Sequence, residues 1–220
     1  MKANRVSMGG TAAVCMCLVA LSYAAAHWLT HDFQVWTAEG SRRLQIALRP
    51  VPAPAVIVDG PDVRDQTLAA LLAGEGKPTI VDFMYTRCVG VCAALGGVFQ
   101  QLQASIGAQR DAEGTVPLRL LSISFDPGHD DATALAAYGA ALRADPRIWR
   151  FARTADPAHT RALLDRFQVT VISDGLGGYE HNAALLVVDA AGRLARVFDY
   201  EEIETALAFA RSLPAAGAAQ

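Results

Sequence analysis

The chain has 220 residues, of which 52% are hydrophobic, so it is long enough for one well-buried domain plus a short accessory segment. Its 19 Lys and Arg against 22 Asp and Glu leave a formal net charge of −3, without the basic block that neutralises a phosphate backbone. We therefore expect no nucleic acid partner. The four cysteines form two close pairs, Cys15 with Cys17 and Cys88 with Cys92, which is too few for a small disulfide-stapled fold.

An uncharged apolar stretch at residues 9–29 has about the ~20-residue length that spans a bilayer as a helix, and the first cysteine pair fits there as small apolar residues. Lys2 and Arg5 precede this stretch, and no Lys or Arg follows until Arg42. The positive-inside rule therefore predicts that the N-terminus stays in the cytoplasm and that the rest of the chain is exported across the membrane. We predict that residues 1–30 form a signal anchor in the inner membrane, with the domain facing the oxidising periplasm. Residues 24–26 resemble a signal-peptidase site, but the apolar run is long for a cleaved signal, which favours a retained anchor.

Residues 31–54 are predicted to form a linker, because RPVPAP at residues 49–54 is typical of an extended segment. We expect the folded domain at residues 55–213 and a frayed Ala-rich tail at 214–220. Within the domain, apolar runs of strand length alternate with stretches of helical period. The predicted strands lie at residues 78–84, 118–125, 184–189 and 193–199, and the predicted helices at 92–107, 131–143, 157–167 and 201–213.

Continuous apolar strands separated by helices indicate a sheet that is covered on both faces, as in α/β domains. The element order is a strand, a cysteine pair that opens a helix, further alternation, and a closing hairpin with a helix. This order predicts a thioredoxin-like domain, with a central mixed sheet and helices on both faces, after the N-terminal membrane helix. The functional site is then expected at the carboxyl ends of the strands, where such folds bind ligands.

The second cysteine pair follows the first strong strand, in VDFMYTRCVGVC at residues 81–92. Residues four apart on a helical turn have Cβ atoms about 5–6 Å apart, so Cys88 and Cys92 can form a disulfide or bind one soft ion. The N–H groups at a helix start favour the thiolate form. A purely stabilising disulfide is disfavoured, because so short a loop removes little entropy from the unfolded chain. A thioredoxin-type exchange pair normally has two intervening residues, and the three present here favour metal binding.

Two thiolates leave a cuprous ion short of a third ligand, for which an imidazole is the obvious supplement. His181 ends DGLGGYEH, a glycine-rich stretch at residues 174–181 that we predict to be a mobile loop before a strand. His129 follows FDPG and is an alternative secondary donor, whereas His159 is interpreted as a surface residue. Taken alone, His181 also fits an ordinary turn histidine.

Three motifs resemble the Sco family, also called SenC or PrrC proteins, which are copper chaperones of cytochrome c oxidase assembly. The segment FMYTRCVGVC at residues 83–92 is similar to the family pattern F-x-Y-T-x-C-x-x-x-C. The segment LSISFDPGHD at 121–130 is similar to S-x-D-P-x-x-D, and YEHNAALLVVD at 179–189 to H-(S/N)-x-x-x-x-L-x-D. The resemblance covers roughly residues 55–212.

This resemblance implies that Cys88, Cys92 and His181 bind a copper ion, as Cu(I) or Cu(II), and that Asp126 and Asp130 are the acidic positions beside the metal loop. It also implies delivery to the CuA site of cytochrome c oxidase subunit II, with an upstream periplasmic copper donor as a further partner. Some relatives act instead as thiol-disulfide reductants of the cysteines of that subunit.

Two positions depart from the family pattern, since Ala93 stands where proline is usual and Asp131 where threonine is usual. Neither change removes a ligand. We interpret the chain as a carrier of copper rather than an enzyme.

The main alternative is a periplasmic thiol-disulfide oxidoreductase in which Cys88 attacks and Cys92 resolves the mixed disulfide. A peroxiredoxin-like peroxidase is a weaker alternative, because only Thr86 and Arg87 match the surroundings of a peroxidatic thiol. His181 separates the first two functions, since three-coordinate copper needs it and disulfide exchange does not.

Overall fold

The first element in the described part of the chain is a long apolar helix. A computed structural model describes residues 8–30, 32–33, 35–74, 76–88 and 91–215, with the backbone alone at 91–93. Helix α1 (Met8–Leu29) is long and apolar enough to cross a membrane, and this confirms the expected candidate anchor. Near its carboxyl end the ring of Phe33 lies 5.4 Å from that of Tyr23 and 5.9 Å from that of Trp36, centroid to centroid. Such aromatic groups are typical of a membrane–water interface.

The predicted linker contains regular structure. Helix α2 (Ala38–Leu48) starts after Thr37, whose hydroxyl accepts the N–H of Gly40, and Glu39 pairs with two arginines one turn later. The proline-rich segment is extended, as expected, but part of it is strand β1 (Val51–Pro52), which pairs with a neighbouring strand. Proline is tolerated there because β1 lies at the edge of the sheet. By its contacts the chain divides into two units, Met1–Gln45 and Ile46–Gln220.

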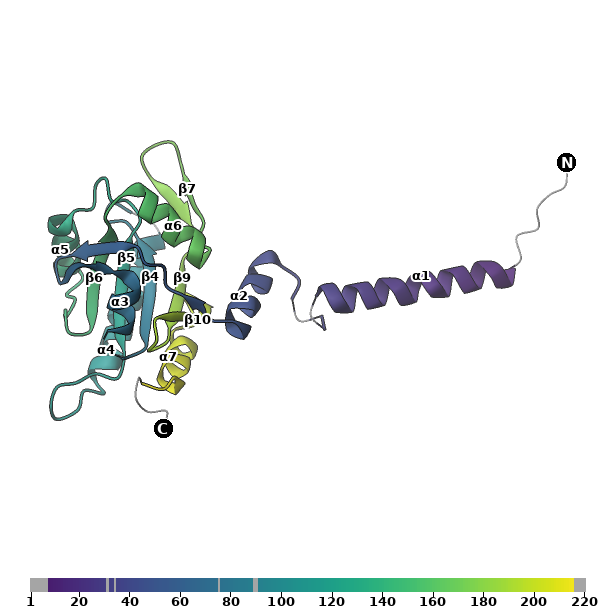
Figure 1. Ribbon diagram of the computed structural model, residues 1–220, viewed down its shortest axis with the longest axis horizontal. Coiled ribbons are helices and arrows are strands. Elements are labelled where there is room, and N and C mark those ends of the chain that lie inside the picture. The colour runs from purple at the N-terminus through teal and green to yellow at the C-terminus, as the bar shows by residue number, and fades with distance from the viewer. Residues whose placement is uncertain (1–7, 31, 34, 75, 89–90, 216–220) are drawn as a thin grey trace. The chain divides into compact units, whose positions relative to one another are not determined.

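The second unit is built on an eight-stranded sheet with the order β1-β10-β9-β4-β5-β6-β2-β3. The central strands β4, β5 and β6 are parallel, and antiparallel strands flank them on both sides. The mixed sheet therefore agrees with the prediction (Figure 1). The strand bounds are β2 (Ile57–Gly60), β3 (Val63–Thr67), β4 (Thr79–Met84), β5 (Arg119–Ser124), β6 (Trp149–Thr154), β9 (Ala184–Val188) and β10 (Arg193–Asp199).

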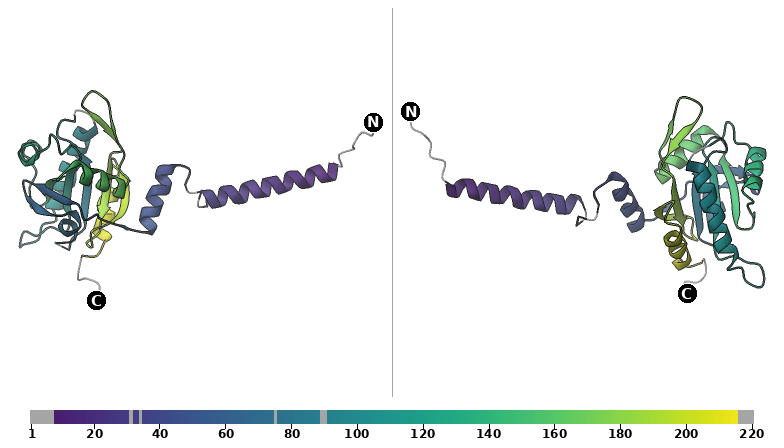
Figure 2. Two further views of the ribbon diagram at one scale, coloured as in Figure 1. Left: turned by 45° about the horizontal axis from the view of Figure 1, so that its top comes forward. Right: turned by 180° about the vertical axis from the view of Figure 1, so that it is seen from behind.

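Helices cover both faces of this sheet, as predicted. The first core lies under α3 (Leu68–Ala73) and α6 (Pro157–Phe167), and the second under α4 (Val91–Gly107), α5 (Ala132–Ala141) and α7 (Ile203–Ser212). Along β4 the side chains alternate, so Val81 and Phe83 enter the first core, whereas Ile80 and Met84 enter the second. Figure 1 shows α3 in front of the sheet, and the view from behind in Figure 2 shows α4 in front.

Aspartate side chains cap two of the helices. Asp156 accepts the N–H groups of Ala158 and His159, and Pro157 takes the first position of α6, the helix predicted at residues 157–167. Asp131, one of the departures from the family pattern, caps α5 by accepting the N–H of Ala134 at 2.8 Å. Its substitution for threonine therefore keeps a capping side chain at this position.

Candidate metal centre

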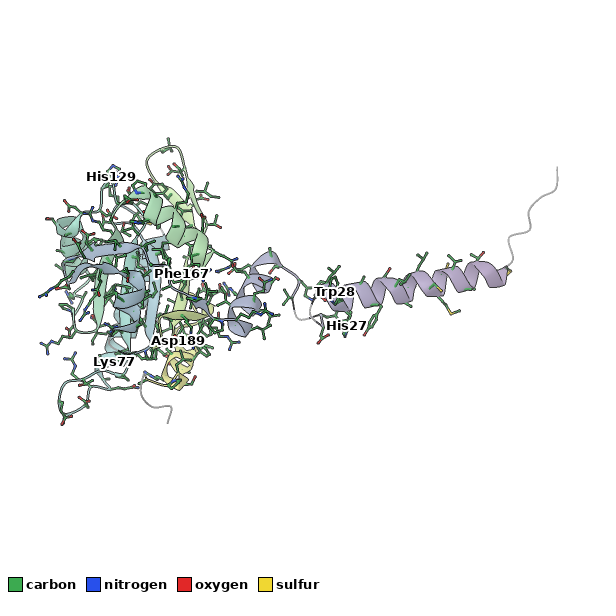
Figure 3. All side chains as sticks on the ribbon, in the orientation of Figure 1. His27, Trp28, Lys77, His129, Phe167 and Asp189 are labelled. Atoms are coloured by element: carbon green, nitrogen blue, oxygen red, sulfur yellow. The ribbon has the colours of Figure 1, made fainter. Side chains whose placement is uncertain are left out.

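The predicted site residues gather at one edge of the sheet. Parallel strands β4 and β5 end at the same edge, and β9, which is antiparallel to β4, begins there. The segment that carries His181 directly precedes β9, so it lies beside the loop that follows β4. In Figure 3, His129 after β5 and Lys77 before β4 lie at opposite ends of the domain, which marks the site end.

Cys88 lies on the turn between β4 and α4. Its backbone N–H bonds to the carbonyl of Tyr85 at 3.3 Å, and its half-buried side chain packs against the first core. Cys92 belongs to the first turn of α4, as predicted, but its side chain lies outside the described residues. The contact between the two thiols therefore stays a prediction.

The buried side chain of Asp130 holds the cysteine turn in place through hydrogen bonds. The carboxylate is fully buried and accepts the backbone N–H of Thr86 at 3.0 Å and the hydroxyls of Thr86 and Ser124, each at 2.5 Å. Three hydrogen bonds to one buried carboxylate fix the chain two residues before Cys88. We infer that Asp130 positions the cysteine turn rather than binding metal directly.

Asp126 contacts the same turn through Arg87, the residue before Cys88. Its buried carboxylate accepts a 2.9 Å bond from Nη2 of Arg87 and lies 2.9 Å from Nδ1 of the half-exposed His129. The same guanidinium nitrogen is 3.0 Å from the His129 ring. The acidic positions predicted beside the metal loop are thus brought to it, with His129 against Asp126.

His181 lies in a hairpin rather than in the predicted mobile loop. Strand β7 (Val171–Ser173) pairs with β8 (Tyr179–His181), and His181 is opposite Val171. The carboxylate of Asp174 closes the tip by accepting backbone N–H groups at 2.7 and 2.9 Å. The glycines that suggested a loop are turn residues, since Gly175 and Gly177 have positive φ at this tip.

The imidazole of His181 is partly buried, and this desolvation lowers its pKa below the usual value of 6.5. The neutral ring is the form that binds metals. The centroid of this ring lies 5.3 Å from that of Phe125, which fixes the histidine against the loop after β5.

An aromatic cluster that sequence reasoning missed joins the three segments. The ring of Tyr85 lies 5.4 Å from that of Phe125 and 5.3 Å from that of Tyr179, and the Tyr85 hydroxyl accepts the N–H of Tyr179 at 3.1 Å. Phe125 and Tyr179 are also in contact, with centroids 5.5 Å apart. The cluster therefore connects the cysteine turn, the loop after β5 and the histidine hairpin. The sequence signal was that Tyr85 belongs to the family pattern and that Phe125 and Tyr179 lie within the other two motif segments.

The donor set suits a soft or borderline ion, because thiolates and an imidazole select copper or zinc over calcium or magnesium. Among the described side chains, which exclude that of Cys92, no three Cys, His, Asp or Glu residues lie close enough to hold a metal ion. A complete three-ligand site thus needs Cys92, and the proposed ligand set remains a prediction.

Comparison with known proteins gives the family. The sequence model described as SCO1/SenC matches residues 66–213, which is more than half of the chain. The chain belongs to the SCO1/SenC family. A search of curated protein sequences finds no match.

Solved Sco structures share this fold. Copper-bound ScoI of Bradyrhizobium japonicum is 22% identical over 74% of this chain and 99% of its own, with a TM-score of 0.58. Copper-bound yeast Sco1 is 15% identical over 76% and 92%, with a TM-score of 0.60. BsSco, described as a Sco-family cytochrome c oxidase assembly protein with a disulfide switch, is 18% identical over 76% and 96%, with a TM-score of 0.61. These likenesses confirm the thioredoxin-like fold of the Sco domain.

Proposed function

We propose that this chain is a membrane-anchored copper metallochaperone that delivers copper to the CuA site of cytochrome c oxidase subunit II. The observation that carries the proposal is the placement of the Cys88 turn and the His181 hairpin at one sheet edge, where Tyr85, Phe125 and Tyr179 join them. Cys92 in the first turn of α4 supplies the second thiolate of the ligand set. Two of the similar structures were solved with copper bound, which supports the choice of metal.

The copper ion is cargo in this proposal. Cys88 and Cys92 bind it as thiolates and His181 completes a three-coordinate site, from which ligand exchange passes the ion to the acceptor. The proposed location is the inner membrane, with α1 as the anchor and the Sco domain in the periplasm, where an upstream copper donor loads the site.

A thiol-disulfide oxidoreductase that reduces the CuA-site cysteines is the second candidate. It is supported by the same cysteine pair and by the disulfide switch named for BsSco. The two functions differ in their need for His181, because thiol exchange uses no atom of the imidazole.

The variant His181→Ala distinguishes copper delivery from thiol-disulfide exchange. We expect the Cu(I) affinity, measured on the detergent-solubilised chain by competition with a chelator, to fall at least tenfold, which corresponds to about 1.4 kcal/mol of lost ligation. The rate at which the reduced variant opens a CuA-domain disulfide should stay unchanged.

His159→Ala is the matched control, because this imidazole lies on α6 and pairs with the exposed Asp156. Unchanged copper affinity in His181→Ala would rule out the three-ligand site. If both the copper affinity and the rate of CuA-domain disulfide reduction in His181→Ala equalled those of the wild type, the oxidoreductase would be the better assignment.

A further inference from the structure

Tyr85 is a buried residue that contacts both the cysteine turn and the histidine hairpin. Its backbone carbonyl accepts the N–H of Cys88 at 3.3 Å, so it belongs to the turn itself. Its side-chain hydroxyl reaches strand β8, where it accepts the N–H of Tyr179 at 3.1 Å and lies 3.5 Å from the carbonyl oxygen of the same residue. Tyr179 stands two positions before His181 on β8. One residue therefore connects the cysteine turn to the strand that carries the imidazole.

The hairpin of β7 and β8 needs contacts with the rest of the domain, because a two-stranded hairpin is only marginally stable by itself. The bonds that close its tip lie within the hairpin and do not tie it to the domain. Ile172 and Leu176 of this hairpin are 61% and 92% exposed, so they add little packing. The position of the hairpin therefore depends on its other face, on which Tyr179 and His181 lie and which meets Tyr85.

The N–H of Tyr179 points away from the partner strand. Tyr179 is opposite Ser173 in the ladder of β7 and β8, and its N–H bonds to the Tyr85 hydroxyl instead of to β7. Without that hydroxyl, the N–H of this partly buried residue loses its acceptor, which is costly unless water takes the place of the hydroxyl. Water gains access when β8 moves away from the ring of Tyr85. Such a movement would carry His181 away from the cysteine turn.

We propose that Tyr85 is a positioning residue for copper, whose hydroxyl holds β8 where His181 completes the copper site. In this role Tyr85 acts through the position of the imidazole and is not itself a ligand. Opening of the hairpin removes one ligand and leaves the two thiolates in place, so the bond between Tyr85 and Tyr179 also controls how readily copper leaves for an acceptor. This inference rests on the ligation by His181 in the proposed function.

The test is a double-mutant cycle of Cu(I) affinity, measured with a competing chelator on the reduced full chain in detergent. Tyr85→Phe removes the hydroxyl and keeps the ring. We expect it to weaken copper binding by a factor between roughly threefold and tenfold, where about tenfold is the limit set by one hydrogen bond. In the His181→Ala background the same substitution should have no further effect, because no imidazole is left to position. A hydroxyl that only stabilised the fold would have the same effect in both backgrounds.

Tyr138→Phe is the matched control, since it removes a tyrosine hydroxyl from α5, which covers the opposite face of the sheet. This variant should bind copper as tightly as the wild type. Wild-type affinity in Tyr85→Phe, or an equal loss in both backgrounds, would overturn the proposal. If His181→Ala weakens copper binding and Tyr85→Phe does not, the role of Tyr85 is rejected and the proposed function stands. Wild-type affinity in His181→Ala would reject both.

Amide hydrogen exchange gives a second readout that needs no substitution. Because binding and closure are coupled in both directions, loading the wild-type chain with Cu(I) should slow the exchange of the Tyr179 N–H. In the metal-free chain, Tyr85→Phe should speed the exchange of this N–H by up to about tenfold and leave the amides of β9 unchanged. Equal exchange of the Tyr179 N–H in the metal-free and copper-loaded wild type would contradict the proposal, even if Tyr85→Phe failed to fold.

Discussion

Cys88→Ser and Cys92→Ser should each reduce bound copper from one ion per chain to none. One remaining thiolate cannot replace a two-sulfur site for a soft ion, and a serine hydroxyl stays protonated at neutral pH. The measurement is copper content after loading the reduced, detergent-solubilised chain with Cu(I) and removing unbound metal. Oxidation of the pair to a disulfide should have the same effect, since the ligands must be thiolates.

The first cysteine pair supplies the control for this experiment. Cys15 and Cys17 lie on α1, within the candidate membrane span, so Cys15→Ser with Cys17→Ser should retain one copper. If either single substitution at Cys88 or Cys92 retained full copper content, the predicted ligand set would be wrong. Loss of copper in the α1 double variant alone would move the site to the membrane segment.

Asp82, which is buried in the middle of β4, should make the wild-type chain less stable as the pH rises. Burial raises the pKa of Asp82 to about 7 in the folded protein, against 3.8, so the folded protein binds the proton more tightly than the unfolded chain. This contribution to stability is fully present below pH 3.8 and is lost as the pH rises to about 7. The shift corresponds to roughly 4 kcal/mol in the free energy of unfolding. We expect this dependence to disappear in Asp82→Asn, which should therefore be more stable than the wild type at pH 8 and about equal at pH 4.

Denaturant unfolding at several pH values measures this difference, and Asp145→Asn gives a control of opposite sign. Asp145 accepts a 2.8 Å bond from Arg110, which lowers its pKa, so its contribution is present at pH 8 and lost as the solution becomes acidic. A wild type and an Asp82→Asn variant with parallel stability profiles from pH 4 to 8 would contradict the raised pKa of Asp82.

Local signals predicted much of the fold. The helix at residues 157–167 and the strand at 193–199 have the predicted bounds, because a capping Asp156 with Pro157 and the turn around Gly192 are encoded in neighbouring residues. Strand β6 and the hairpin of β2 and β3 were not predicted. Their burial depends on pairing with distant strands, and β6 contains Arg150 and Arg153, which interrupt an apolar pattern.

The positions of several candidate site residues were predictable from the sequence, whereas the contacts that hold them in place were not. Cys88, Asp126 and Asp130 lie at the expected edge because parallel strands β4 and β5 end together. The contacts of Tyr85 with Phe125 and Tyr179 join segments that are far apart in the sequence, and no local pattern encodes them. Likewise, the burial of Asp82 follows from helices on the face of the sheet and was not foreseen from its place in an apolar strand.

Copper transfer tests the proposed function most directly. The reduced full chain in detergent is loaded with one Cu(I) and mixed with the copper-free CuA domain of cytochrome c oxidase subunit II, and copper is counted on each protein after separation. We predict that copper moves from the wild-type chain to the CuA domain. The site of His181→Ala binds copper more weakly, and from this variant the CuA domain should take up no more copper than it takes from a Cu(I) chelator with the same affinity as the variant. Copper that stays on the wild-type chain, while the same acceptor fills from the chelator, would contradict a role in delivery.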